Sequence, residues 1–162
     1  MKAITVRQPY AWAIIHGGKD VENRTRNIVG TYRGPLLIHA AKQLADDDYL
    51  DDRVASAVGE LAQAGYPLPR VPQIAGDAPT PGNVITPWYG HLGGVIGVVD
   101  LVDVHKAARC VGIHGEHCSD WAHPDGEHLA LANPRPFAEP IPYRGALGLW
   151  TFPDELLPEV AW

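Results

Sequence analysis

The first part of the chain carries a strand pattern followed by a helix pattern. Residues 2–7 alternate in polarity, with Ile4 and Val6 on one face, which predicts a strand of period two. Pro9 stands where the first turn of a helix tolerates proline, and apolar positions then recur at helical spacing. Gly17 and Gly18 are expected to end this helix. Residues 19–26 are therefore predicted to be the stretch that leaves it.

Later apolar runs predict more strands and one long helix. Residues 35–41 form a continuous run, typical of a strand covered on both faces, and residues 95–104 form another strand. Shorter patterns predict strands at 128–131 and 143–152, with a turn or extended segment at 133–136. The helical pattern at 43–64 has an acidic first half, as suits a helix start. Residues 110–127 are irregular and rich in histidine.

The remaining segment is an insertion. Residues 65–94 are rich in proline and glycine and show no period, which is typical of a lid or a mobile segment. The length of 162 residues suits one domain, so we expect a single domain over 1–162 that carries this insertion. Several short strands, one long helix and many turns favour an α+β, mainly β fold. The expected form is a small barrel or curled sheet with helices outside.

Charge narrows the class of partner. A formal net charge of -6 argues against unspecific binding of long duplex DNA, yet it allows one basic pocket on an acidic body. A nucleic-acid partner is therefore expected to be a nucleotide or a short single-stranded segment. No apolar run approaches the ~18–20 residues of a membrane helix, and no apolar leader opens the chain. A cytoplasmic location without membrane contact is the expectation.

Cysteine and histidine gather between residues 110 and 123. Two cysteines are too few for the disulfide framework of a secreted domain. Zinc prefers ligands of these types, which here are Cys110, His114, His117 and Cys118, with His123 nearby. Their spacing matches no standard finger, and adjacent His117 and Cys118 suit shared tetrahedral coordination poorly. No cofactor is therefore expected, with zinc as the alternative.

Charged residues cluster after the glycine pair. Lys19 can hold an anion when charged or act as a base when neutral, and Glu22 is placed to pair with it. The planar fork of Arg24 suits a carboxylate or phosphate. Asp100 interrupts an apolar strand, where a carboxylate is costly unless paired, so Lys19 or Arg24 is the expected partner. The alternatives are a surface Lys–Glu bridge, an internal ion pair of Arg24 and a solvent-facing Asp100.

Other candidates are uncharged or titrate near neutral pH. Gln8 beside Trp12 suits a pocket that stacks a base and reads its edge, although Trp12 at helical spacing is also typical of a core. His39 ends an apolar run, where it can act as an acid or base or be structural. Loop aromatics are further stacking candidates: Trp88, Tyr89 and Trp121.

The stretch GGKDVENR, residues 17–24, resembles the G-x-K-x-x-E-x-R signature of ASCH domains, which belong to the PUA-like superfamily. The lead-in ITVRQPYAWAIIHG is similar to that family's first strand and helix. The segments YRGPLLIHAAK, GGVIGVVDLVDV and LANPRPFAEPIPYRGALGLW are similar to its next strand, its central strand and its closing segment, in the same order. The resemblance spans most of the chain except residues 65–90. It implies a small PUA-like β-barrel with flanking helices and a cleft suited to RNA or nucleosides.

The resemblance also implies several activities. Family members hydrolyse the acetyl amide of N4-acetylcytidine, bind or cleave RNA, or occur in transcription coactivator complexes. Lys19 matches the catalytic lysine of the amidohydrolase branch, whereas Glu22 stands where that branch has threonine. Asp100 is the best match for its acidic residue on the central strand, with Asp103 second.

Together these features predict an RNA- or nucleoside-binding protein, with hydrolysis of a modified nucleoside or of RNA as its expected chemistry. The alternative is a non-catalytic RNA-binding or coregulator-like interaction module. The candidate catalytic residues are Lys19, Glu22 and Asp100. The candidate substrate-binding residues are Gln8, Trp12, Arg24 and His39.

Overall fold

The computed structural model describes residues 1–45, 52–64, 91–114 and 117–158. Its elements in chain order are β1 (Lys2–Gln8), α1 (Tyr10–His16), β2 (Val21–Arg24), β3 (Gly34–Leu44), α2 (Asp52–Gln63), β4 (Gly94–Lys106), α3 (Ala107–His114), β5 (Glu127–Pro142), β6 (Trp150–Thr151) and the 3-10 helix η2 (Asp154–Leu156). Among these residues, no helix combines the length and the apolar character needed to cross a membrane.

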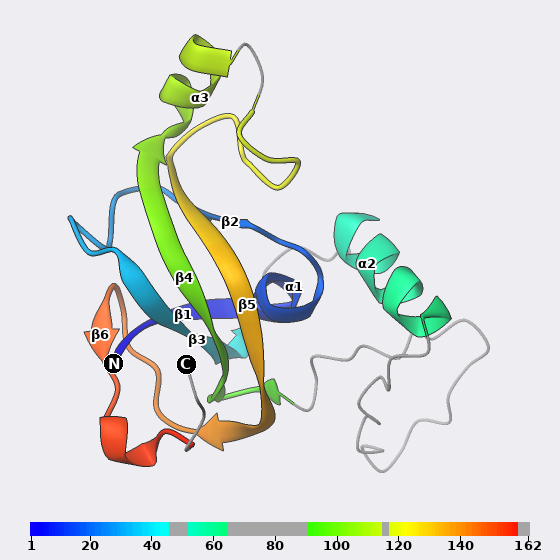
Figure 1. Cartoon of the computed structure of the whole chain (residues 1–162), viewed down its shortest axis with the longest axis vertical. Coiled ribbons are helices and arrows are strands. Elements are labelled where there is room, and N and C mark those ends of the chain that lie inside the picture. The colour runs from blue at the N-terminus through cyan, green and yellow to red at the C-terminus, as the bar shows by residue number, and fades with distance from the viewer. Residues whose placement is uncertain (46–51, 65–90, 115–116, 159–162) are drawn as a thin grey trace.

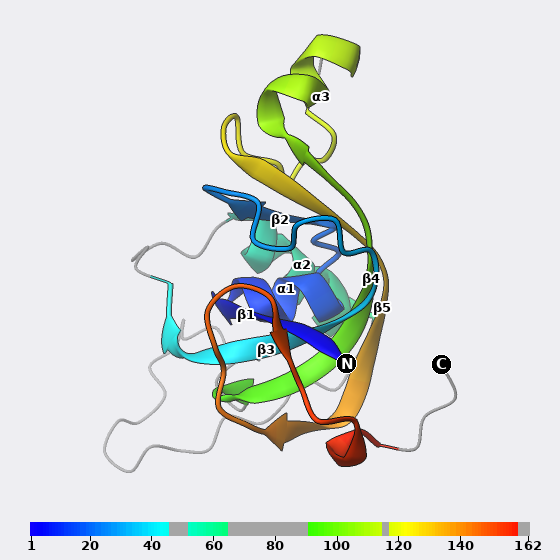
Figure 2. The ribbon, with the colours of Figure 1, turned by 90° about the vertical axis from the view of Figure 1, so that its left-hand side faces the viewer.

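One six-stranded sheet organises the chain, in the order β2-β5-β4-β3-β1-β6. β1 and β3 run parallel, and the other neighbours are antiparallel. The long strands β4 and β5 lie side by side (Figure 1), and the sheet curls around α1 (Figure 2). The α+β, mainly β class is confirmed. In the described part of the chain β2 and β6 are edge strands, so the predicted closed barrel is not confirmed.

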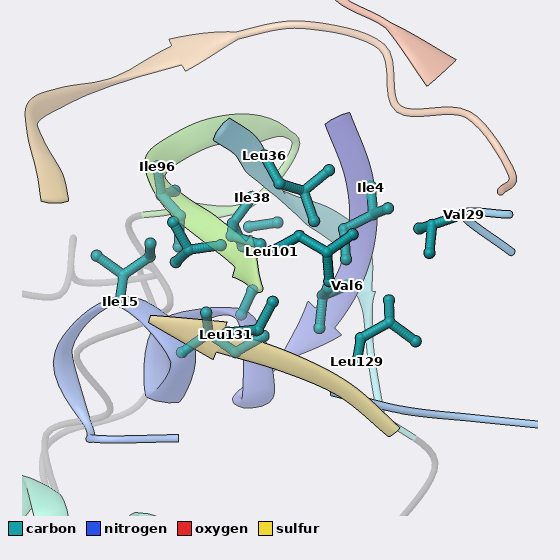
Figure 3. Close-up of a cluster of buried hydrophobic side chains, with 14 residues drawn as sticks. Ile4, Val6, Ile15, Val29, Leu36, Ile38, Ile96, Leu101, Leu129 and Leu131 are labelled. Carbon is teal, nitrogen blue, oxygen red and sulfur yellow. The ribbon is translucent and has the colours of Figure 1, made fainter. Parts of the chain in front are cut away.

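Both faces of the sheet are covered, as the run at 35–41 predicts. Leu36 and Ile38 of β3 join the main core, which packs on α1 (Figure 3), whereas Leu37 between them joins a second cluster with Val98 and Phe152. This alternation defines two faces, called here the α1 face and the outer face. A third cluster lies between α1 and α2 and contains Trp12, Val21, Val54, Val58 and Trp121.

The structure differs from the sequence prediction mainly at β5. Residues 133–136, predicted as a turn or an extended segment, are extended and continue the strand beyond 128–131 to Pro142. The register with β4 shifts between Val98 and Asp100, and Asn133, with φ 50, lies in the stretch of β5 that faces this shift. Such a bulge admits prolines that a regular central strand would not.

Other boundaries also move. The predicted helix at 43–64 is wrong at its start, because residues 43 and 44 extend β3 and α2 begins at Asp52. β2 was predicted only as chain leaving a helix, and α3 includes residues 110–114 of the stretch predicted to be irregular. Of the strand predicted at 143–152, only Trp150–Thr151 forms. Most of the predicted insertion, 65–90, lies outside the described residues, with Trp88 and Tyr89, and Gly94 already begins β4.

Candidate functional site

A tight turn between α1 and β2 places the charged cluster. The backbone N–H groups of Gly17 and Lys19 both donate to the Ala13 carbonyl, at 2.9 and 3.0 Å, which ends the helix. Gly18 between them has φ 69, a conformation that favours glycine. The Asp20 carbonyl then accepts from the Leu131 N–H at 2.8 Å, and this bond leads the chain into β2 beside β5.

Lys19 is buried, with only 4% of its surface exposed. Its Nζ donates to the Val21 carbonyl and lies 5.7 Å from the ring centre of Tyr10 and 5.4 Å from that of Trp121. Aromatic faces attract an ammonium group, and the attraction grows when water is excluded. These are contacts that favour the charged side chain, as in a group that binds an anion or a polar ligand.

Arg24 joins the two ends of the curled sheet. Its Nη2 donates to the Thr5 carbonyl at 2.8 Å and lies 3.1 Å from Oε1 of Glu22. Thr5 is in β1 and Arg24 is in β2, which stand near opposite ends of the strand order. The internal ion pair that was the alternative for Arg24 is therefore present, and it spans the gap where the sheet does not close by backbone hydrogen bonds. Glu22, at 7% exposed, is part of this buried bridge.

Gln8 and Trp12 are held together by a hydrogen bond. Oε1 of Gln8 accepts a hydrogen bond from the Trp12 backbone N–H at 2.8 Å and so satisfies a donor in the first turn of α1. Nε2 of Gln8 is buried and has no hydrogen-bond partner among the described residues. Trp12 is only 2% exposed and belongs to the core under α2. Its burial favours the core reading over a role in stacking a bound base.

A depression of about 220 Å³ lies beside the Lys19 turn. It is called here the Lys19 depression, and its lining comes from the end of α1, the turn, β4 and the bulged part of β5. Apolar side chains form much of the wall, with Lys19, Asp20 and Asn133 as the polar groups. The lining residues are Ile14, Gly18, Lys19, Asp20, Val99, Leu131, Ala132, Asn133 and Pro134.

Asp100 lies on the outer face and is bound there by other partners. Nη2 of Arg135 donates to its Oδ1 at 2.7 Å, and Nδ2 of Asn133 donates to Oδ2 at 2.8 Å. These hydrogen bonds hold the pKa of the Asp100 carboxyl below its usual value, and the bond from Arg135 has the larger effect. The expectation that Lys19 or Arg24 is its partner is wrong, because Asp100 pairs in register with Pro35 beside Leu37 of the outer-face cluster.

His39 lies on the outer face as well. Its Nε2 donates to the Tyr143 carbonyl at 3.0 Å, and its ring packs edge-on against Trp150. Burial lowers the pKa of His39, which favours the neutral ring. The sheet therefore separates Asp100 and His39 from Lys19, Glu22, Arg24 and Gln8.

A second cluster gathers thiols and imidazoles at the far end of β4 and β5. Ligand atoms of His105, Cys110, Cys118 and His128 all lie within 4.8 Å of one another, a set that could hold a metal ion. Two of these residues were predicted, whereas His105 and His128 were not. Neither His117 nor His123 belongs to the cluster found among the described residues, and the side chain of His114 lies outside them. Only strand register reveals the two missed ligands, because His105 and His128 are a cross-strand pair.

Comparison with known proteins gives one family. The family model described as ASCH domain matches residues 4–141. Two crystal structures of the ASCH protein from Zymomonas mobilis are similar to this chain. The wild type has 15% identity, covers 96% of this chain and 89% of its own, and has a TM-score of 0.49. A Tyr-to-Phe variant has 14% identity, coverage of 96% and 91%, and a TM-score of 0.49. No protein of curated function matches.

Proposed function

Because this chain belongs to the ASCH domain family, we propose that it binds a nucleoside or a short single-stranded RNA segment at the Lys19 depression. The observation that carries the proposal is the position of Lys19. Its buried Nζ lies near two aromatic rings, and the residue also lines the Lys19 depression. A cation held in this way is ready to attract a phosphate or a base carbonyl without first being ordered.

The size and lining of the depression support a ligand the size of one base. At about 220 Å³ it is smaller than the ~300–1,000 Å³ of typical small-molecule sites. Ile14, Val99 and Leu131 offer apolar surface for a planar ring, and the Asp20 carboxylate can accept hydrogen bonds from its edge. RNA is recognised in this way when single-stranded bases are splayed out of the chain. The acidic body disfavours a long duplex.

The contacts of Lys19 favour binding over amide hydrolysis. A catalytic lysine would have to be neutral to act as a base or nucleophile, whereas two aromatic rings and a carbonyl favour its cation. The carboxylates of β4 also have other partners: Asp100 is bound by Arg135, and Asp103 lies 3.5 Å from Arg33 and 2.8 Å from His105. Asp100, the expected acidic residue of the amidohydrolase arrangement, is therefore held by Arg135.

Equilibrium binding tests this proposal. The wild-type chain is titrated by calorimetry with nucleosides, with N4-acetylcytidine and with a short single-stranded RNA. Lys19→Met keeps most of the side-chain volume and removes the charge, so binding should fall at least tenfold, the loss of one charged hydrogen bond. Lys42→Met is the matched control, since Lys42 is exposed on β3, and it should bind like wild type.

The same samples test for chemistry. After incubation, N4-acetylcytidine and RNA should be recovered unchanged. Release of cytidine or RNA fragments by wild type but not by Lys19→Met would show that the protein is a hydrolase and not only a binding protein. If Lys19→Met is folded by circular dichroism and binds as tightly as wild type, the depression is not the site.

A further inference from the structure

We propose that His105, Cys110, Cys118 and His128 form a structural zinc site that fixes the segment covering Lys19. The proposal goes beyond RNA binding and does not depend on it. Nε2 of His105 lies 2.9 Å from Sγ of Cys110, and Nδ1 of His128 lies 3.3 Å from both sulfur atoms. In a tetrahedral zinc site with Zn–S of about 2.3 Å and Zn–N of about 2.0 Å, ligand atoms lie roughly 3.4–3.8 Å apart. These three distances are slightly shorter than the required spacing, and all four atoms lie within 4.8 Å of one another.

The two imidazoles are already oriented as zinc ligands. Nδ1 of His105 donates to Oδ2 of Asp103 at 2.8 Å, and Nε2 of His128 donates to the His123 carbonyl at 2.8 Å. Each ring therefore carries its proton on the outer nitrogen and turns the lone pair of the other nitrogen toward the sulfurs. Carboxylates and backbone carbonyls orient metal-binding histidines in this way. Simple packing of a histidine against a thiol requires no such arrangement of both rings.

Burial and topology favour a structural ion over a catalytic one. His128 is fully buried and Cys110 nearly so. The ligands come from the end of β4, from α3, from the loop after it and from the start of β5. Four protein ligands complete a tetrahedron and leave no open position for substrate, as in structural sites. A thiolate pair with two neutral imidazoles gives a net neutral centre with zinc, which is compatible with burial.

The ion would fix one side of the candidate site. Cys118 stands three residues before Trp121, the ring that packs against Lys19. Asn23 of β2 already binds this segment, since its Nδ2 donates to the Trp121 carbonyl at 2.8 Å and its Oδ1 accepts from the His123 N–H at 2.9 Å. Zinc would therefore tie the same segment at both of its ends.

Metal analysis tests the site directly. The chain is expressed without a histidine tag in zinc-supplemented medium, purified under reducing conditions and analysed by inductively coupled plasma mass spectrometry. One zinc per chain is expected. Exchange with cobalt(II) should give the thiolate charge-transfer band and the intense d–d bands of a tetrahedral S2N2 site.

Variants separate this ligand set from the neighbouring histidines. Cys118→Ser and His105→Gln should lose the metal, whereas His117→Gln should keep it, because His117 is exposed outside the cluster. Asp103→Asn should weaken zinc affinity about 10- to 100-fold through the orientation of His105.

Some results would overturn the site. They are wild-type protein that takes up neither zinc nor cobalt, a metal-free chain with Cys110 and Cys118 joined in a disulfide, and metal content unaffected by Cys118→Ser and His105→Gln. If either variant fails to fold, the cobalt spectrum of the wild type still decides the ligand types.

Discussion

Removal of Arg24 should destabilise the fold far more than removal of its neighbour Arg26. In the structure Arg24 donates to the Thr5 carbonyl and pairs with the buried Glu22. Arg24→Ala would leave a buried carboxylate without this cation and take the donor from a carbonyl of β1. Breaking a buried ion pair on one side costs about 3–5 kcal/mol. Since the Arg24 side chain is 27% exposed, the low end applies, about 3 kcal/mol.

The assay is thermal and urea unfolding, each followed by circular dichroism. For a chain of this length, 3 kcal/mol corresponds to a Tm lowered by roughly 6–12 °C. Arg26→Ala, at an exposed loop position, should stay within about 0.5 kcal/mol of wild type. The double variant Glu22→Gln, Arg24→Met should recover part of the loss, because it removes both charges together.

Equal stability of Arg24→Ala and Arg26→Ala would refute this reasoning. It would mean that the Glu22 carboxylate reaches water and that the bridge between β1 and β2 contributes nothing. A double variant less stable than Arg24→Ala would show instead that Glu22 has another essential partner.

Three further predictions concern packing and pH. Gly145→Ala should destabilise by about 1–3 kcal/mol, since its Cβ would lie 2.6 Å from the His39 ring, whereas Gly59→Ala meets nothing within 4 Å and should stabilise α2 by up to about 1 kcal/mol in the same melts. Trp12→Ala should lower the free energy of unfolding by about 3–5 kcal/mol, and a folded Trp12→Phe variant should bind nucleosides normally if the ring is purely core. Burial lowers the pKa of His16 to about 4, so between pH 6.5 and 4 only the unfolded chain takes up a proton at this residue. The free energy of unfolding should therefore fall over this range, by less than about 3 kcal/mol because the ring is half-buried. The fall should be smaller in His16→Phe.

Each of these has a clear contrary result. If Gly145→Ala is as stable as wild type, the segment beside His39 can shift to accommodate the methyl group without loss of stability. Weak nucleoside binding by a folded Trp12→Phe variant would show that the Trp12 ring takes part in ligand binding. If His16→Phe loses as much stability on acidification as the wild type does, groups other than His16 cause the loss.

Local patterns predicted the centre of the sheet well. Apolar periodicity predicted β1, α1, β3 and β4. In each of these elements the spacing of the apolar residues within the segment is enough to identify the element, without knowledge of a partner strand. The full length of β5 was not predicted, because Pro134 and Pro136 left both a turn and an extended segment open after the short strand at 128–131. They are accommodated only by the register shifts against β4, and these depend on a partner strand.

The same limit applies to the sites. The turn at Lys19 could be predicted, since the glycine pair Gly17 and Gly18 is expected to end the helix before it. The faces of Asp100 and His39 could not, because alternation within a strand does not say which side meets α1. The cysteines were visible as ligands, but His128 joins them through strand pairing 18 residues beyond Cys110.

The central claim is that the Lys19 depression receives the ligand, and chemical-shift mapping tests it most directly. Backbone and indole N–H signals of the 15N-labelled chain are followed while a nucleoside or a short single-stranded RNA is added. Saturable shifts are expected at Gly18, Lys19, Asn133 and the Trp121 indole. Shifts centred on His39 and Trp150 of the outer face, or none at all, would contradict it.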